Sequence, residues 1–172
     1  MYVLNILIHK LPIDKRLGQE GVINAERRIV ISVGSVDGLS VIGVIDQIHN
    51  VFEFFAWFSG LLSELLVKSD APRFLNDSGA LAESIDNFYQ HATDVEIEKF
   101  GDELFDYRKV HDFRFGFRGT NVPSILLGRW HDSITISSVC EKGFNFKLNP
   151  DALVVSYIFN TDLSGEELMK TF

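Results

Sequence analysis

The pattern of apolar and polar positions is most pronounced over residues 41–68, where more than half of the side chains are large and apolar. On a helical wheel, seven positions of this stretch fall within about 40° of one line. They recur every three or four residues: Asp46, Asn50, Glu53, Trp57, Gly60, Glu64 and Lys68. A helix with one narrow polar stripe is covered on most of its sides. The pattern therefore predicts a central core helix along this stretch.

The start of this helix is open to two interpretations. Residues 39–44 also fit a β-strand, in which case the helix would begin near Asp46, with the Asp46 carboxylate as its N-cap. The end is better defined, because Pro72 follows closely and the residue before a proline disfavours helical geometry. The sequence therefore leaves the start between Leu39 and Asp46.

Strands are expected before the central helix. Residues 2–9 and 27–33 are rich in residues that favour strands, and residues 34–38 (GSVDG) supply turn residues. The sequence thus places two strands at the N-terminal side of the core helix.

Two more helices are expected after the central helix. The first covers residues 79–91 and has an apolar face made of Leu81, Ile85, Phe88 and Tyr89. Thr93 and Glu96 then form a capping-box pattern, in which both side chains bind free backbone N–H groups at a helix start. The helix that follows has an inward face made of Ile97, Phe100 and Leu104, and its other sides are acidic.

From residue 111 onward the apolar residues recur at every second position, which is typical of strands. Strands are expected over residues 111–118, 125–130, 133–137, 144–149 and 153–159. The short linkers between them predict an antiparallel meander with one face buried. The last strand is apolar on both faces and is expected inside the sheet, and a capping-box pattern at 164–167 predicts a short terminal helix.

The order of these elements predicts an α+β fold. An antiparallel sheet, made of the N-terminal strands and the C-terminal meander, would pack against the central hydrophobic helix and the acidic helices. The chain has 172 residues, of which 46% are hydrophobic, and contains no linker-like segment. A single globular domain over residues 1–172 is therefore expected.

Composition indicates the cellular compartment in which the protein is expected. Cys140 is the only cysteine, which fits a reducing compartment and excludes a Cys-based zinc site. The N-terminus lacks the basic region of a signal peptide, so a cytoplasmic location is expected. In the central stretch, Asp46, Glu53 and Glu64 would each be costly inside a bilayer, so no membrane span is expected.

Charge is distributed unevenly along the chain. The net charge is −8, and residues 61–111 carry 11 acidic and 5 basic side chains, which is −6 of that total. This excess disfavours nucleic acid as a partner and would attract a basic protein. The candidate contact residues are Glu83, Asp86, Glu96, Glu98, Asp102, Glu103 and Asp106. The same run also fits an ordinary solvated face.

Trp57 lies on the polar stripe of the central helix. An exposed tryptophan is a common interface anchor, so Trp57 is a further candidate contact. The alternative is that the stripe is simply the solvent edge of a packed helix.

Two histidine–aspartate pairs are the candidates for catalysis. His111 and His131 each precede an aspartate at the edge of an expected strand, and two histidines can serve as acid and base in a metal-independent nuclease. The alternative is that both are polar residues at strand ends. No H-x-x-x-H or H-E-x-x-H spacing occurs, so neither a metal nor another cofactor is expected.

A small acidic α+β chain with one cysteine and no catalytic motif resembles the cytoplasmic immunity proteins of bacterial polymorphic and contact-dependent growth-inhibition toxin systems. The resemblance lies in the overall character of the chain and includes no diagnostic motif. It implies a non-enzymatic protein that binds a cognate, basic, nuclease-type toxin domain and occludes its active surface. Two alternatives stay open: a small hydrolase or nuclease using His111 and His131, and an adaptor that dimerises through an exposed sheet edge. The sequence leaves the oligomeric state open.

Overall fold

The computed structural model describes residues 2–10, 26–35, 41–67, 70–75, 79–140, 143–150 and 154–160. The elements follow one another as β1 (Tyr2–Lys10), β2 (Glu26–Ser35), β3 (Val41–Asn50), α1 (Val51–Leu66), α2 (Leu81–His91), α3 (Asp94–His111), α4 (Phe113–Gly116), β4 (Leu126–Trp130), β5 (Ser133–Ser138), β6 (Phe144–Lys147) and β7 (Val154–Asn160). The strands β1–β3 come first, the helices α1–α4 follow, and the strands β4–β7 come last. This segregated order confirms the α+β class predicted from the sequence. None of the helices within these ranges combines the length and the apolar character that crossing a bilayer requires.

The strands form two sheets, where the sequence predicted one. The larger sheet has the order β3-β2-β1-β7 and the smaller one β4-β5-β6. β1, β2 and β3 pair antiparallel, whereas β7 runs parallel to β1. The predicted C-terminal meander is therefore confirmed for β4, β5 and β6 only. β7 crosses to the other sheet and lies at its edge, so its expected interior position in the meander is wrong.

The central stretch is divided between a strand and a helix. The alternative of a strand at the beginning of the stretch is confirmed from Val41, but β3 runs on to Asn50, so a helix start near Leu39 or near Asp46 is wrong. A helix occupies most of the rest of the stretch. Asn50 is the N-cap, and its Oδ1 accepts hydrogen bonds from the backbone N–H groups of Phe52 (3.0 Å) and Glu53 (3.3 Å). Asp46 is on the strand instead, where its carboxylate pairs with the Arg28 guanidinium at 2.6 and 2.8 Å.

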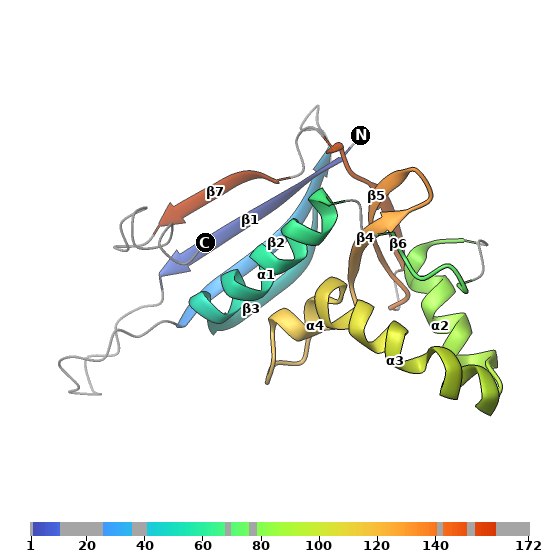
Figure 1. Ribbon diagram of the computed structural model, residues 1–172. Helices are drawn as coiled ribbons and strands as arrows, with labels where there is room; N and C mark the ends of the chain where they lie inside the picture. The colour runs from blue at the N-terminus through green and yellow to red at the C-terminus, as the bar shows by residue number, and fades with distance from the viewer. Residues whose placement is uncertain are drawn as a thin grey trace.

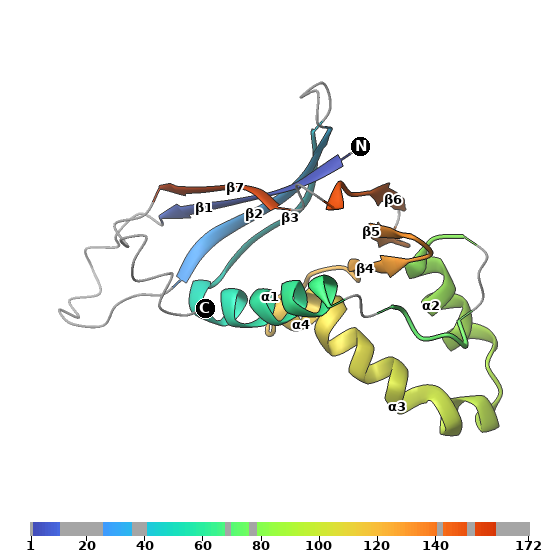
Figure 2. The same ribbon diagram turned by 45° about the horizontal axis from the view of Figure 1, so that its top comes forward.

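α1 covers one face of the larger sheet, as Figure 2 shows from the side. Its buried side chains are Val51, Phe54, Phe55, Phe58, Leu61 and Leu65. They meet the inward side chains of β1 and β2, such as Ile6 and Ile31, in the larger hydrophobic cluster. Every second residue of β2 is buried from Arg27 to Val33, as a sheet with one covered face requires.

A second, smaller cluster lies between the smaller sheet and the pair α2 and α3 (Figure 1). It includes Leu81 and Ile85 of α2 and Leu104 of α3. β4 separates the two clusters, because Leu127 belongs to the larger one and its neighbour Leu126 to the smaller one. Because successive side chains of a strand point to opposite faces, β4 contributes residues to both hydrophobic clusters.

The capping-box prediction at Thr93 is confirmed. The Thr93 Oγ1 accepts from the backbone N–H of Glu96 (3.3 Å), and the Glu96 carboxylate accepts from the Thr93 N–H (2.8 Å). α3 begins at the next residue. The helix expected at 79–91 is confirmed as α2.

The strand predicted over residues 111–118 is wrong, because this segment contains the end of α3 and the short helix α4. Asp112 caps α4: its Oδ1 accepts from the backbone N–H of Arg114 at 3.1 Å. Phe113 and Phe117, four residues apart, are both 0% exposed, which places them on one side of the turn. The turn expected at 36–38 and the terminal helix expected at 164–167 lie outside the described residues.

Candidate functional site

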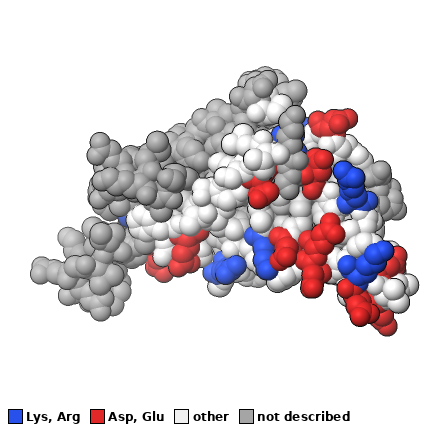
Figure 3. All heavy atoms as spheres, viewed as in Figure 1, with Lys and Arg blue, Asp and Glu red and all other residues white. Residues whose placement is uncertain are grey.

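α3 presents two opposite faces, one buried and one acidic. Leu104, Tyr107 and His111 are its buried residues. Their spacing of three and four residues places them on one side of the helix. The acidic side chains occupy the remaining sides, and Figure 3 shows acidic groups with basic ones between them over this part of the surface. The sequence-predicted acidic face is therefore on the outside of the molecule.

Three acidic residues of α3 make up what we call the free acidic group: Glu98, Asp102 and Glu103. All three side chains are exposed. Glu98 and Asp102 are one helical turn apart and lie on the same side. Within the described parts of the chain, none of the three has an ion-pair or hydrogen-bond partner. Their charges are thus fully available to a partner.

The other four acidic residues among the predicted contacts have local partners. Glu83 accepts from the Ala80 N–H at 3.0 Å, and Asp86 accepts from the Gln90 side chain at 2.6 Å. Asp106 pairs with Lys109 at 2.6 Å. The hydrogen bonds of Glu96 with the Thr93 backbone and side chain lower its pKa, which keeps it ionised at the helix N-terminus. These four carboxylates stabilise their helices as well as adding to the surface charge.

Apolar side chains lie exposed among the acidic ones, and sequence reasoning missed them. Val95 is 72% exposed, Phe105 47% and Ile97 39% on α3. The prediction had placed Ile97 on the inward face. The ammonium of Lys109 lies 4.6 Å from the centre of the Phe105 ring. The sequence does contain a signal for them, because Val95 and Phe105 are apolar residues at positions of α3 outside its inward stripe.

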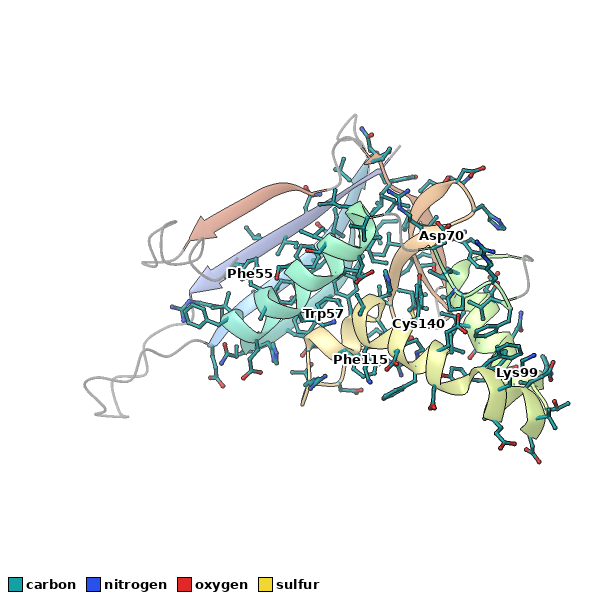
Figure 4. The ribbon with its side chains drawn as sticks, in the orientation of Figure 1. Phe55, Trp57, Asp70, Lys99, Phe115 and Cys140 are labelled. Atoms are coloured by element: carbon teal, nitrogen blue, oxygen red, sulfur yellow. The ribbon has the colours of Figure 1, made fainter. Side chains whose placement is uncertain are left out.

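Trp57 is not an exposed anchor. It is half-buried, and its indole N–H donates to the carbonyl oxygen of Lys109 at 2.8 Å. Its ring packs edge-on against Phe113, with 5.2 Å between the ring centres. Figure 4 shows Trp57 on the side of α1 that faces α3 and α4. The prediction that Trp57 is exposed is wrong, and its role in the structure is to hold the C-terminal end of α3 against α1.

His111 is enclosed in the protein interior. It is 1% exposed, and its Nδ1 donates to the carbonyl oxygen of Leu127 at 2.8 Å. Burial lowers the pKa of His111, so the imidazole is neutral near pH 7. Its ring stacks on Tyr107 with 4.1 Å between the ring centres. These contacts are those of a hydrogen-bonded core histidine.

Asp112 is a buried carboxylate held by several donors. It is 0% exposed, and it accepts from Arg114 Nη2 (2.7 Å), Arg108 Nη2 (3.0 Å) and Ser124 Oγ (2.9 Å). Burial raises its pKa to about 6, while the hydrogen bond from Ser124 and the charge of Arg108 act against that rise. The cluster ties the α3–α4 junction to the segment that precedes β4.

His131 lies elsewhere, in the turn between β4 and β5. It is exposed, and Trp130 before it is three strand residues from Leu127, which is about 10 Å along β4. The structure therefore does not bring the two candidate histidines together. Among the described residues there is also no group of three or more His, Cys, Asp or Glu side chains placed to hold a metal ion.

The edge of the larger sheet bears on the adaptor hypothesis. Within the described ranges, β3 pairs only with β2. The pairing slips between Ile31 and Ser32, which face Ile45 and Gly43, so Val44 is an extra residue in β3. A bulge and a charged side chain such as Asp46 are features that protect a sheet edge from pairing with another chain.

The fold and this surface define an α+β protein with an acidic, partly apolar helix exposed on one side. The chain matches no family model, no curated protein and no solved structure.

Proposed function

We propose that this chain is a non-enzymatic immunity protein that acts in the cytoplasm. It would bind a cognate, basic, nuclease-type toxin domain and neutralise it by covering its active surface. The observation that supports the proposal is the free acidic group, Glu98, Asp102 and Glu103, whose exposed carboxylates have no partner in the described structure.

Electrostatics would bring the two proteins together. A net charge of −8 attracts a basic domain over a range set by the Debye length, about 8 Å at physiological ionic strength. Such attraction mainly raises the association rate. A nuclease active surface must be basic to hold phosphates, so the surface that the toxin needs is also the one that an acidic helix binds.

The exposed apolar side chains would add contact area to this attraction. Val95 and Phe105 lie on the same helix as the free acidic group and are 72% and 47% exposed. Aromatic side chains are enriched in the buried centres of interfaces. The α3 surface therefore combines charge for rapid encounter with apolar groups for a lasting contact.

The test is a binding measurement with the toxin-like protein encoded immediately upstream, which the proposal expects to exist and to form a complex. The double variant Asp102→Lys and Glu103→Lys should associate at least about tenfold more slowly than the wild type at low salt. The difference should shrink as the ionic strength rises, because salt screens exposed charges. Stopped-flow mixing at several salt concentrations measures both effects.

A matched control is the double variant Asp70→Lys and Asp132→Lys. It has the same change in net charge, and both substituted residues are exposed near the β4–β5 turn, away from α3. It should keep most of the wild-type association rate. Equal slowing in both variants would assign the effect to net charge alone, and unchanged rates after reversal of Asp102 and Glu103 would remove α3 from the interface. The absence of any complex with the upstream protein would contradict the proposed function itself.

A further inference from the structure

A pocket with a volume of about 370 Å³ lies between the segment after α1 and the end of the β4–β5 hairpin. One wall is formed by residues 70–73 and Leu75, and the other by the end of β4 with its turn. The two walls are joined by a hydrogen bond from the Ala71 N–H to the Arg129 carbonyl (3.3 Å). Figure 4 labels Asp70 beside β4 and β5. The volume falls within the range of small-molecule sites.

Two of the side chains around this pocket are held by hydrogen bonds to the backbone. Arg129 Nε donates to the Leu65 carbonyl at 3.0 Å, and the Trp130 indole N–H donates to the Gly79 carbonyl at 2.9 Å. The Trp130 ring also contacts the His131 ring, with 4.8 Å between the centres. Because the Arg129 bond uses Nε, both Nη groups of its guanidinium remain for a ligand.

Side chains of both charge signs line the pocket. Arg73 and Arg129 contribute guanidinium groups, and Asp70 and Asp132 contribute carboxylates. Across the residues described, no ion pair within 4.0 Å joins any two of these four. Since none of these four groups is engaged in an ion pair among the described residues, both guanidinium groups and both carboxylates remain for a ligand.

The backbone at the pocket is also strained. His131 has φ = +52°, and it is the first of the two residues that connect the paired positions Trp130 and Ser133. Glycine or asparagine is preferred where a hairpin turn requires a positive φ. A histidine in this conformation costs stability, and such strain is concentrated at ligand sites.

We propose that this pocket binds a small zwitterion of the free α-amino acid class. The ligand carboxylate would be held by Arg73 and Arg129, since guanidinium groups match carboxylates in geometry and charge. The ligand ammonium would be held by Asp70 and Asp132, and its side chain would contact the apolar floor made by Leu75 and Trp130. This site is distinct from the α3 surface, so it does not depend on the proposed toxin binding.

The experiment is a titration of the full chain with L-alanine, followed in ¹H–¹⁵N spectra. The chain has two tryptophans, so the Trp130 indole signal is assigned with the Trp57→Phe variant. L-alanine should shift the Trp130 indole signal in a saturable manner. Acetate and methylammonium, which each carry one of the two charges, should each bind at least about tenfold more weakly.

Variants show which charges carry the binding. Arg73→Gln and Asp132→Asn should each weaken L-alanine binding by about tenfold. Arg118→Gln, an exposed arginine outside the pocket, should leave binding unchanged, and the spectra themselves report whether each variant is folded. Any of three results would overturn the proposal: no saturable shift up to tens of millimolar L-alanine, acetate or methylammonium binding as tightly as L-alanine, or equal weakening by Arg118→Gln.

Discussion

At the scale of single residues, the neighbours His111 and Asp112 show how burial changes ionisation. Both are almost fully buried. Burial lowers the pKa of His111 and raises that of Asp112 to about 6, because in each case the charged form is disfavoured. Each keeps a hydrogen-bond partner, Leu127 for His111 and Ser124 for Asp112. The two residues therefore oppose one another in the pH dependence of stability.

The direction of each pH effect on stability follows from whether the folded or the unfolded chain binds the proton more tightly. Below its ordinary pKa of 6.5, the unfolded chain protonates His111 whereas the folded chain resists protonation. The His111 contribution is therefore complete above pH 6.5 and is lost as the pH falls through the lowered pKa. Asp112 contributes in the opposite direction: it favours the folded state at low pH, and this contribution is lost as the pH rises from 3.8 to about 6.

We predict that His111→Asn removes part of the acid sensitivity. Asparagine keeps a donor for the Leu127 carbonyl but has no proton to take up. Between about pH 7.5 and about pH 5.5 the wild type should lose about 1 kcal/mol more stability than the variant, as measured by urea unfolding at each pH. Asp112 is present in both proteins, so its contribution cancels. The control is His91→Asn, a substitution of an exposed histidine that should keep the wild-type pH dependence. If His111→Asn lost as much stability between the two pH values as the wild type does, a neutral buried His111 would be contradicted.

At the scale of elements, the packing of α1 on α4 determines where the C-terminal end of α3 lies. The Trp57 ring lies directly over Gly116, where an added Cβ would be 2.3 Å from Trp57 Cε3. That close approach allows the indole N–H to reach the Lys109 carbonyl at the end of α3. The direction in which the acidic helix leaves the core therefore depends on a glycine in the neighbouring helix.

We predict opposite effects for one substitution at two glycines. Gly116→Ala should destabilise the protein by about 1–3 kcal/mol, because the methyl group would displace the Trp57 ring. Gly101→Ala in α3 should stabilise it by about 0.5–1 kcal/mol, since the nearest atom, Ile97 Cγ2, would be at an ordinary 3.7 Å and alanine favours a helix. Urea unfolding of the two variants measures both values. Stabilisation in both would show that Trp57 does not pack on Gly116.

At the scale of the whole molecule, two hydrophobic clusters share one strand. Leu126 and Leu127 of β4 point into different clusters, so neither cluster can lose its packing on β4 without affecting the other. The two tryptophans report on them separately, because Trp57 packs against the larger cluster and Trp130 belongs to the smaller one.

We predict one cooperative unfolding transition. In Trp57→Phe, fluorescence follows only Trp130, and in Trp130→Phe it follows only Trp57. Within each variant, the urea midpoint from fluorescence should equal that from far-UV circular dichroism, as two-state unfolding requires. Comparison within a variant removes the effect of the substitution on stability. Separate midpoints would show that the two clusters unfold independently.

The sequence predicted most of the individual elements and the chemistry of the candidate surface. The acidic residues of α3 were located correctly on its outside, because a helix period and a capping box are local properties. Which acidic residues of α2 and α3 have partners was not predicted, although Asp86 with Gln90 and Asp106 with Lys109 have the i,i+4 and i,i+3 spacings of helix side-chain pairs. Ile97 and Trp57 were misplaced for a different reason, because burial depends on which neighbour covers a helix face.

By itself, the sequence determined features that depend on neighbours along the chain. The capping box at Thr93, the period-two pattern of β5 and β6, and the acidic excess of residues 61–111 are all of this kind. The tertiary structure alone decided three others: the division of residues 41–68 at Asn50, the helical turn at Phe113, and the pairing of β7 with β1. Each depends on contacts between residues far apart in sequence. Where a local pattern fits two structures equally well, those distant hydrogen bonds and packing contacts select one of them.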